Sequence, residues 1–373
     1  MEIMSVLFFL VMIVYSILIL WMAFGMKKVS LFVITDHKPK TRFSIVVPFR
    51  NEAKNLPDLL YSFSQLQYPR DLFEVVFVDD GSDDDSVATL KNFPALSFAH
   101  QIVSNQRHSH SPKKDAITTA VRFAKYDWIL TTDADCFVSS DWLKTLDQYI
   151  QKNQCEMVVG AVSFEAGTSF LHHFQQLDLM ALQGATIGSF GIGKPFMCNG
   201  ANFGYTKNLF QELGGFEGNN TVASGDDVFL LQKAIQRFPE KVAYVKSLSN
   251  IVMTKSVTDW KTLLHQRVRW ASKASAYQSG FGKALALVVF AGNLVVVLGL
   301  LMALLGRFAF WDWYLLFAVK IFADFILLYQ TGKFIQNFTV RYYILSNLLY
   351  PFFSVLAGFY ALRGRYEWKG RVF

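Results

Sequence analysis

The chain has 373 residues, too many for one small domain, and 52% of them are hydrophobic, which is high for a soluble enzyme. Its formal net charge of +7 comes without a basic stripe interleaved with aromatic residues. This excludes nucleic acid as a partner and favours anionic groups such as lipid headgroups and diphosphates. Three widely spaced cysteines form no metal-ligand pattern, and a reduced cytosolic domain needs no disulfide.

The hydrophobic residues gather at the two ends of the chain. Val6–Met22 is almost unbroken apolar, and three similar stretches near the other end are roughly Ala284–Leu305, Phe310–Tyr329 and Tyr342–Leu362. Each is long enough for a helix that crosses a hydrocarbon core, which takes about 20 residues. We therefore expect a transmembrane helix at residues 1–26, two to three crossings within 283–362, and a basic tail at 363–373.

Basic residues predict the side of the membrane on which the central part lies. The first apolar stretch is followed by Lys27, Lys28, Lys38, Lys40 and Arg42. The positive-inside tendency then predicts an inner or plasma membrane protein whose globular part is cytoplasmic. A cleaved signal peptide is disfavoured, because no basic segment precedes the apolar run and no small-x-small site follows it. Three C-terminal crossings would place outside the residues Arg363, Arg365, Lys369 and Arg371. Either one stretch is re-entrant or interfacial, or the charge tendency is overridden.

Between the anchors, residues 42–275 alternate between strand and helix patterns. The expected strands are Ser44–Pro48, Glu74–Val78, Phe98–Val103, Trp128–Thr132 and Met157–Val162, and the expected helices are Glu52–Leu66 and Ala116–Ala124. Strands and helices that alternate at these lengths predict an α/β domain with a mostly parallel, Rossmann-like sheet.

Polar clusters follow several of these strands where the strands end. They are Arg50-Asn51-Glu52, Asp79-Asp80-Gly81-Ser82 and Asp133-Ala134-Asp135. Such sheets bind ligands at the carboxyl ends of their strands. Three clusters at one edge predict a site, whereas a single one would be an ordinary loop.

The acidic residues of these clusters suggest specific chemistry. Helix capping explains Asp83–Asp85 but not Asp79 and Asp80, whose carboxylates could accept the imide N–H of a uracil ring or a ribose hydroxyl. Asp133 and Asp135 could share Mg²⁺ or Mn²⁺ with a diphosphate. The same D-x-D pattern also occurs in ordinary loops, and the apolar strand before it favours the metal interpretation.

Two further motifs lie towards the C-terminus of this region. Ser224-Gly225-Asp226-Asp227 opens an amphipathic helix, where capping accounts for one carboxylate and the other could be a general base. Gln266-Arg267-Val268-Arg269-Trp270 lies in a helical stretch from about Asp259. It is either an interfacial belt before the membrane or a site where arginines neutralise a leaving diphosphate and the indole packs beside an acceptor.

Taken in order, these motifs resemble the inverting glycosyltransferases of family two, which have the GT-A fold. The resemblance runs from Val46-Val47-Pro48-Phe49-Arg50-Asn51-Glu52 to Gln266-Arg267-Val268-Arg269-Trp270 and so covers residues 42–275. The last motif is similar to the Q-(Q/R)-x-R-W signature of membrane-integrated members such as cellulose, hyaluronan and ceramide-glucoside synthases.

The resemblance implies a role for individual residues. The nucleoside of the donor would be held by Pro48, Glu52, Asp79 and Asp80. Lys113 would lie near the donor, although Pro112 replaces the family's glycine. Asp133 would hold the donor and the metal, and Asp135 the metal. Asp227 would be the base, although Gly225 and Asp226 replace a threonine and a glutamate. The donor and acceptor pocket would be closed by Gln266, Arg267, Arg269 and Trp270.

The implied reaction is a single in-line displacement that needs Mg²⁺ or Mn²⁺. The donor is a nucleotide-diphosphate sugar, with a UDP-sugar favoured by resemblance alone, and the acceptor is a membrane-associated lipid or glycan. One alternative is a small processive polysaccharide synthase. An alternative of another class is a non-catalytic membrane scaffold that retains the fold, although such a protein would be expected to lose the acidic residues at the sheet edge.

Four other features carry open interpretations. Met197–Phe203 resembles the family's acceptor-side segment, or forms turns. Thr168–Ser189 is either a membrane-surface helix that faces a lipid or a core-packing helix. The loop with His108 and His110 is a lid or an ordinary loop. Lys320 and Asp324, four residues apart in an apolar stretch, favour a structural pair that faces the helix bundle.

Overall fold

The computed structural model describes residues 2–93, 97–219, 225–335 and 341–362, together with the short strands β11 (Glu367–Trp368) and β12 (Arg371–Val372). Ser224 and the remainder of the predicted tail lie outside the described residues. The chain forms two compact units. The sheet unit comprises Ser30–Glu165 and Met197–Lys255, and the helical unit comprises Met1–Val29, Ala166–Phe196 and Ser256–Phe373.

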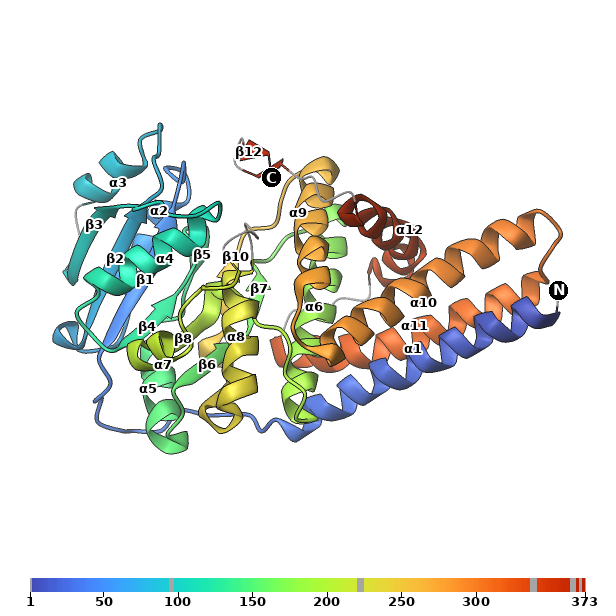
Figure 1. The fold of residues 1–373 in the computed structure, drawn as a ribbon, viewed down its shortest axis with the longest axis horizontal. Helices are drawn as coiled ribbons and strands as arrows, with labels where there is room; N and C mark the ends of the chain where they lie inside the picture. Colours follow the sequence, from blue (N-terminus) through green and yellow to red (C-terminus); the bar gives the residue numbers. More distant parts are fainter. Residues whose placement is uncertain are drawn as a thin grey trace. The chain divides into compact units, whose positions relative to one another are not determined.

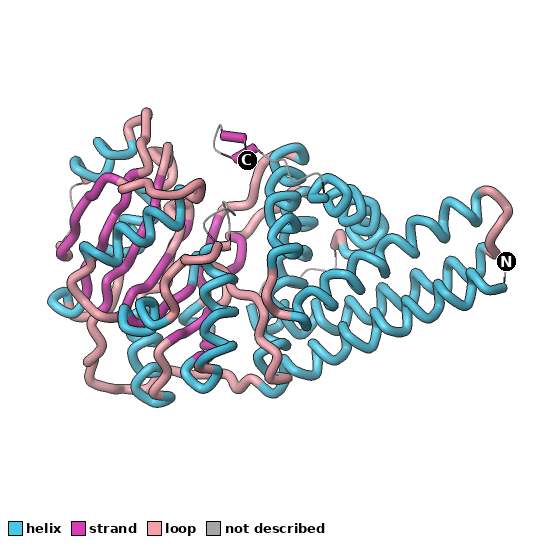
Figure 2. The backbone as a smooth tube through the Cα atoms, viewed as in Figure 1, coloured by secondary structure: helices cyan, strands magenta, loops and turns pink. Residues whose placement is uncertain are grey.

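A 7-stranded sheet forms the centre of the sheet unit, in the order β3-β2-β1-β4-β8-β6-β9 (Figures 1 and 2). Its strands are β1 (Phe43–Phe49), β2 (Phe73–Asp79), β3 (Ala99–Ser104), β4 (Trp128–Thr131), β6 (Met157–Gly160), β8 (Phe203–Thr206) and β9 (Val242–Val245). All neighbouring pairs are parallel except those that β8 makes with β4 and β6. The prediction of a mostly parallel α/β sheet is confirmed.

Helices follow the strands as the alternating pattern predicts. They are α2 (Leu56–Ser64), α3 (Ser86–Asn92), α4 (Pro112–Phe123), α5 (Trp142–Asn153), α7 (Lys207–Glu212) and α8 (Asp226–Arg237). The predicted helix at Glu52–Leu66 begins four residues later. Glu52 and the residues after it form a turn, in which the carbonyl of Glu52 accepts the N–H of Asn55, and Pro57 suits the first helical turn.

Smaller elements complete the sheet unit. A second sheet, ordered β5-β10-β7, consists of β5 (Cys136–Phe137), β10 (Val252–Thr254) and β7 (Val162–Phe164). The short 3₁₀ turns are η1 (Arg70–Leu72), η2 (Gly200–Asn202), η3 (Pro239–Lys241) and η4 (Leu248–Asn250). The single strand predicted at Met157–Val162 is divided into β6 and β7, because the Ala161 carbonyl accepts Val252 N of β10 instead of continuing the larger sheet.

The helical unit contains α1 (Glu2–Lys28), α6 (Phe170–Gly191), α9 (Trp260–Ser272), η5 (Lys273–Ala276), α10 (Gly280–Leu304), α11 (Phe310–Ile335) and α12 (Tyr343–Leu362). Among the described residues, 4 helices are long and apolar enough to cross a membrane. They are α1, α10, α11 and α12, and they coincide with the apolar stretches predicted from the sequence. Glycines let α1 and α6 approach closely, since a Cβ at Gly188 would lie 2.3 Å from the Met22 carbonyl oxygen.

The helical unit also contains two segments that the sequence placed in the domain at 42–275. These are α6 and α9. Phe174, Leu177 and Met180 on α6 are buried, which supports the core-packing interpretation of Thr168–Ser189 over a membrane-surface helix. The physical reason is that the apolar side of α6 packs against helices of its own unit, chiefly α1, α11 and α12.

Candidate active site

The first cluster of the site is the turn that follows β2. Asp79 Oδ1 accepts a hydrogen bond from Ser82 N at 2.9 Å, and Gly81 has a positive φ of 75°. Asn51, also at positive φ, accepts the N–H of Asp83 on its side-chain oxygen at 3.0 Å. Asp79 therefore shapes its own turn, while Asn51 ties the loop after β1 to the loop after β2.

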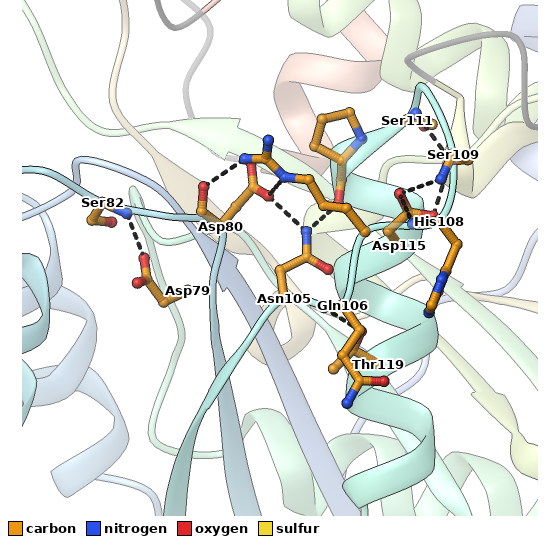
Figure 3. A network of polar contacts seen from close by, with 12 residues as sticks. Asp79, Asp80, Ser82, Asn105, Gln106, His108, Ser109, Ser111, Asp115 and Thr119 are labelled. Carbon is orange, nitrogen blue, oxygen red and sulfur yellow. Dashed lines mark hydrogen bonds and ion pairs between the residues drawn. The ribbon is translucent and has the colours of Figure 1, made fainter.

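Asp80 has a different set of partners, drawn in Figure 3. Its Oδ1 accepts from Arg107 Nε and from Asn105 Nδ2, each at 2.7 Å, and its carbonyl accepts Arg107 Nη2 at 2.8 Å. The Asp80 side chain is 10% exposed and that of Arg107 is 45% exposed. Sequence reasoning missed Arg107 and Asn105. Their position directly after β3, which pairs with β2 in parallel, is the signal that could have identified them.

The loop after β3 is fastened to the start of α4. The buried Asp115 carboxylate accepts the N–H groups of His108 and Ser109 at 3.1 and 2.9 Å, and Gln106 N donates to Thr119 Oγ1 at 3.1 Å (Figure 3). These contacts favour the ordinary-loop interpretation for the segment with His108 and His110.

Pro48 and Glu52 occupy the strand end that was predicted for the nucleoside. Pro48 lies in β1 opposite Val78 of β2. Glu52 is largely buried; its N–H donates to Ser86 Oγ at 2.7 Å and its Oε2 accepts Asn55 Nδ2 at 2.7 Å. Both residues are therefore placed at the carboxyl edge of the sheet, and their contact with a nucleoside stays a prediction.

Lys113 brings carboxylates from two distant segments together. Its Nζ lies 2.6 Å from Asp133 Oδ1, directly after β4, and 3.7 Å from Asp226 Oδ2, at the start of α8. Burial lowers the pKa of Lys113, but the carboxylates of Asp133 and Asp226 outweigh it and hold the pKa well above the usual lysine value. The ammonium group is therefore a permanent cation between two acidic clusters that are far apart in sequence.

Asp227 lies beside this cluster at the first turn of α8. Its Oδ2 accepts Gly200 N of η2 at 2.8 Å, and its Oδ1 accepts Val228 N at 2.7 Å. The preceding Gly225 has φ +86°, and a Cβ there would lie 2.7 Å from the Phe229 ring. The glycine thus permits the sharp entry to the helix that presents Asp226 and Asp227 as neighbours.

The residues predicted for a metal fit a site shared with substrate. Asp133 and Asp135 are partly exposed, whereas Ala134 between them is buried. No group of three or more His, Cys, Asp or Glu side chains that could hold a metal exists within the described ranges. Mg²⁺ commonly takes one or two protein carboxylates together with phosphate and water, so two suffice. Burial and the neighbouring Asp135 raise the pKa of the Cys136 thiol.

The motif Gln266–Trp270 lies on α9, which is a helix as the pattern predicted, but α9 belongs to the helical unit and not to the sheet unit. Arg267 is buried, and its Nε donates to Asp178 of α6 while its Nη1 donates to Gln266 Oε1. The guanidinium lies 4.2 Å from the centroid of the Trp270 ring. Its Nη2 is buried without a hydrogen-bond partner among the residues that the structure describes, and the contact of Arg267 with a diphosphate stays a prediction.

Comparison with known proteins finds a family match that covers much of the sheet unit together with α6. Residues 44–214 match the family described as glycosyl transferase family 2. The chain is 22% identical over 246 residues to the poly-beta-1,6-N-acetyl-D-glucosamine synthase of Staphylococcus epidermidis, covering 65% of this chain and 57% of that protein. It is 35% identical over 96 residues to the undecaprenyl-phosphate 4-deoxy-4-formamido-L-arabinose transferase of Pseudomonas savastanoi, covering 25% and 27%. The chain spans from 19% to 60% of the length of such curated relatives.

A solved structure resembles nearly the whole chain. The mannosyltransferase PcManGT from Pyrobaculum calidifontis, in complex with GDP-Man and Mn²⁺, matches over 97% of this chain and 98% of that one, with a TM-score of 0.57 and 18% identity. At this identity the likeness shows the fold. Residues 44–214 therefore resemble glycosyl transferase family 2 within a GT-A fold, and the prediction of a glycosyltransferase is confirmed at the level of this domain.

Proposed function

We propose that this chain transfers a sugar from a nucleotide-diphosphate sugar to a membrane-associated acceptor, with inversion at the anomeric carbon. The observation that carries the proposal is the position of Lys113, 2.6 Å from Asp133 and 3.7 Å from Asp226. Lys113 thus lies between Asp133, predicted to hold the donor and the metal, and the start of α8, where the predicted base Asp227 lies. A transferase needs both partners in one place, because the acceptor oxygen must attack the donor in line.

The donor side of the proposal rests on the edge of β1, β2 and β4. Asp80 would hold the nucleoside, with Pro48 and Glu52 beside it, and Arg107, which pairs with Asp80, would be a further cation beside the nucleotide. Asp133 and Asp135 would hold Mg²⁺ or Mn²⁺, and a bound metal would offset the negative charge of the diphosphate. PcManGT was solved with GDP-Man and Mn²⁺, which supports a metal and a nucleotide sugar in general. A UDP-sugar is favoured by the resemblance of the motifs.

Asp227 would accept the proton of the acceptor hydroxyl. As that O–H bond breaks, the oxygen bonds to the anomeric carbon, and the bond from this carbon to the diphosphate oxygen breaks with its electron pair leaving on the nucleoside diphosphate. The hydrogen bonds from Gly200 N and Val228 N fix the orientation of the carboxylate. We further propose, from resemblance, that Arg269 stabilises the leaving diphosphate and that Trp270 packs beside the acceptor.

The acceptor is proposed to be a lipid or a glycan at the membrane. The helices α1, α10, α11 and α12 would span the inner or plasma membrane, with the sheet unit in the cytoplasm. A relative named for transfer to undecaprenyl phosphate supports a lipid acceptor. The second candidate is a small processive polysaccharide synthase, and a relative named as a poly-beta-1,6-N-acetyl-D-glucosamine synthase favours it. The length of the product distinguishes a single sugar transfer from polymer synthesis.

The test is release of nucleoside diphosphate by the full chain in lipid nanodiscs. A panel of UDP- and GDP-sugars is assayed with Mg²⁺, Mn²⁺ or chelator, in the presence of lipid extract. We expect one donor to be consumed, with activity lost under chelator and restored by metal. Asp227→Asn should lower kcat about 10³-fold, the scale of a lost general base, while donor binding by calorimetry is retained.

A matched control is the surface variant Asp71→Asn, in η1, which should keep wild-type kcat. Retention of more than about one tenth of the activity by Asp227→Asn would contradict the role of this residue as the base. Absence of turnover and of donor binding across the whole panel would favour the scaffold alternative over a transferase.

A further inference from the structure

Asp178 is a buried carboxylate on α6 whose two oxygens have different partners. Oδ2 accepts Arg267 Nε of α9, and Oδ1 accepts the hydroxyl of Tyr350, on α12, at 3.0 Å. The side chains of Arg267 and Asp178 are 7% and 6% exposed. A buried ion pair with this little exposure is held in place, because separating its members would leave an unpaired charge inside the protein.

Arg267, held by Asp178, contacts two other residues of the motif Gln266–Trp270. Another nitrogen of the guanidinium donates to Gln266 Oε1, and its plane lies over the Trp270 ring at 4.2 Å. The planar guanidinium has several donors in a fixed arrangement, so one carboxylate that fixes Nε also fixes the remaining N–H groups. Asp178 thereby determines the orientation of two side chains that lie on either side of Arg267 in sequence.

We propose that Asp178 is a positioning residue for the motif Gln266–Trp270, and that Arg267 acts through Gln266 and Trp270 rather than by touching the diphosphate. The inference rests on the proposed function in that this motif serves the transfer. It adds one residue, Asp178, that no motif identifies, and it changes the role of Arg267, which the sequence had assigned to the donor.

A second carboxylate of the same unit provides a matched control. Asp324 of α11 accepts Lys320 Nζ at 2.6 Å and the Tyr15 hydroxyl at 2.6 Å, so it too has one cation and one tyrosine. Lys320 is 1% exposed and Asp324 14%. The two sites share burial and chemistry, but the cation of Asp324 lies on α11 and is no part of the motif on α9. The sites are neighbours, since Lys320 Nζ lies 5.7 Å from the centroid of the Tyr350 ring, so the control tests whether disturbance of a nearby buried pair is enough to loosen α9.

The experiment compares Asp178→Asn with Asp324→Asn in the full chain in nanodiscs. Hydrogen exchange is the first readout, because it does not depend on turnover. We expect Asp178→Asn to speed exchange about tenfold in peptides from Trp260–Ser272, and Asp324→Asn to leave those peptides unchanged while affecting α11. Equal acceleration across α9 in both variants would overturn the proposal, since it would report general loosening.

Steady-state kinetics are the second readout. Asp178→Asn should lower kcat about tenfold or more and change the donor KM less than about threefold, whereas Asp324→Asn should change kcat less than about threefold. A rise in donor KM with unchanged kcat would overturn the proposal, because that pattern indicates a donor-binding residue. A wild-type chain without turnover, combined with the expected exchange result, would refute the proposed reaction and leave the positioning of the motif supported.

The paired variant Asp178→Leu with Arg267→Met covers the case in which Asp178→Asn does not fold. It removes both charges and keeps most of the side-chain volume. Replacement of a buried ion pair by apolar side chains of similar volume often leaves the stability of the protein unchanged or higher. We expect the pair to exceed the kcat of Arg267→Met alone at least threefold, about 0.7 kcal/mol. If the pair regains normal exchange in α9 but its kcat equals that of Arg267→Met, Arg267 contacts substrate and the proposal fails.

Discussion

Three carboxylates in loops or at a helix start of the sheet unit are held mainly by backbone N–H groups, whereas two buried carboxylates of the helical unit are held by side chains. Two other carboxylates of the sheet unit, Asp80 and Asp133, also pair with cations, Arg107 and Lys113. In the sheet unit, Asp79 accepts the N–H of Ser82, Asp115 those of His108 and Ser109, and Asp227 those of Gly200 and Val228. In the helical unit, Asp178 and Asp324 each accept one cation and one tyrosine hydroxyl.

The difference follows from the supply of backbone N–H groups. Loops at strand ends and the first turns of helices have N–H groups without a backbone partner, and these are available to carboxylates. Inside a long helix every N–H is used in a bond to the carbonyl four residues earlier. A carboxylate buried among helices must therefore take side-chain donors. Loss of one donor should therefore lower the unfolding free energy more in the helical unit than in the sheet unit. The following predictions measure that difference.

The largest effect is expected for Lys320→Met. The change leaves Asp324 buried in the helical unit with the Tyr15 hydroxyl but without its cation, and an uncompensated buried charge costs about 3–5 kcal/mol of unfolding free energy. Denaturant titration in detergent micelles measures the loss. The double variant Lys320→Met with Asp324→Leu should recover most of the lost unfolding free energy. A loss under about 1 kcal/mol in the single variant would show that Asp324 does not behave as an uncompensated buried charge.

A smaller effect is expected for Lys113→Met in the sheet unit. Without the ammonium, Asp133 and Asp226 repel an incoming diphosphate, so we expect nucleoside-diphosphate affinity to fall about 10- to 100-fold, or about 1.4–2.7 kcal/mol. Calorimetry with Mg²⁺ measures it. Because the pKa of Lys113 is raised, its charge is present below and well above neutrality, and wild-type affinity should show no lysine titration between about pH 6 and 9. Lys125→Met, before β4 at the opposite sheet edge, is the control, and an equal drop there would indicate a non-specific charge effect.

Asp115→Asn should have a weaker effect on stability. The amide oxygen can still accept the N–H groups of both His108 and Ser109, which share Oδ2, but the amide nitrogen replaces the oxygen that accepts Ser109 Oγ, so we expect a loss of about 1 kcal/mol in unfolding free energy. Hydrogen exchange should rise mainly in the loop that follows β3. A loss as large as that of Lys320→Met would remove the distinction between the two units.

The smallest effect concerns Asp84 and acid. Burial raises the pKa of Asp84, but hydrogen bonds from the side chain and N–H of Ser86 and from Ala53 N outweigh it and lower the pKa below the usual aspartate value. A lowered folded-state pKa contributes stability above about pH 4, and that contribution is lost as pH falls through the folded value. Asp84→Asn should therefore flatten the decline in Tm below about pH 4. If the Tm of Asp84→Asn fell as steeply below about pH 4 as the Tm of the wild type and of the control variant Asp83→Asn, Asp84 would not have a lowered pKa in the folded state.

Much of the sheet unit could be predicted from local patterns. Runs such as Phe43–Phe49 are buried and end in polar turns, and parallel strands end at one edge. The clusters at Asp79, Asp80 and Asp133 therefore had to lie along that edge. The antiparallel β8, Phe203–Thr206, was missed, because Gly204 inside it weakens the strand pattern.

The residues that pair with charged side chains could not be predicted from local sequence patterns. Asp80 was recognised, but Arg107 was not, since its contact depends on β3 lying beside β2. Local patterns do not distinguish Asp79 from Asp80, whereas in the structure Asp79 accepts Ser82 N and Asp80 accepts Arg107 Nε; contact with a nucleoside stays a prediction for both.

The sequence by itself determined the α/β alternation, the apolar helices at both ends and the acidic edge, because each depends on residues close together in the chain. Only the tertiary structure decided that α6 and α9 belong to the helical unit and that Asp178 pairs with Arg267, 89 residues away. A helix pattern shows that one side is apolar without showing what covers it. The partner of a buried charge is set by which helices pack together, and that packing is a property of the whole fold.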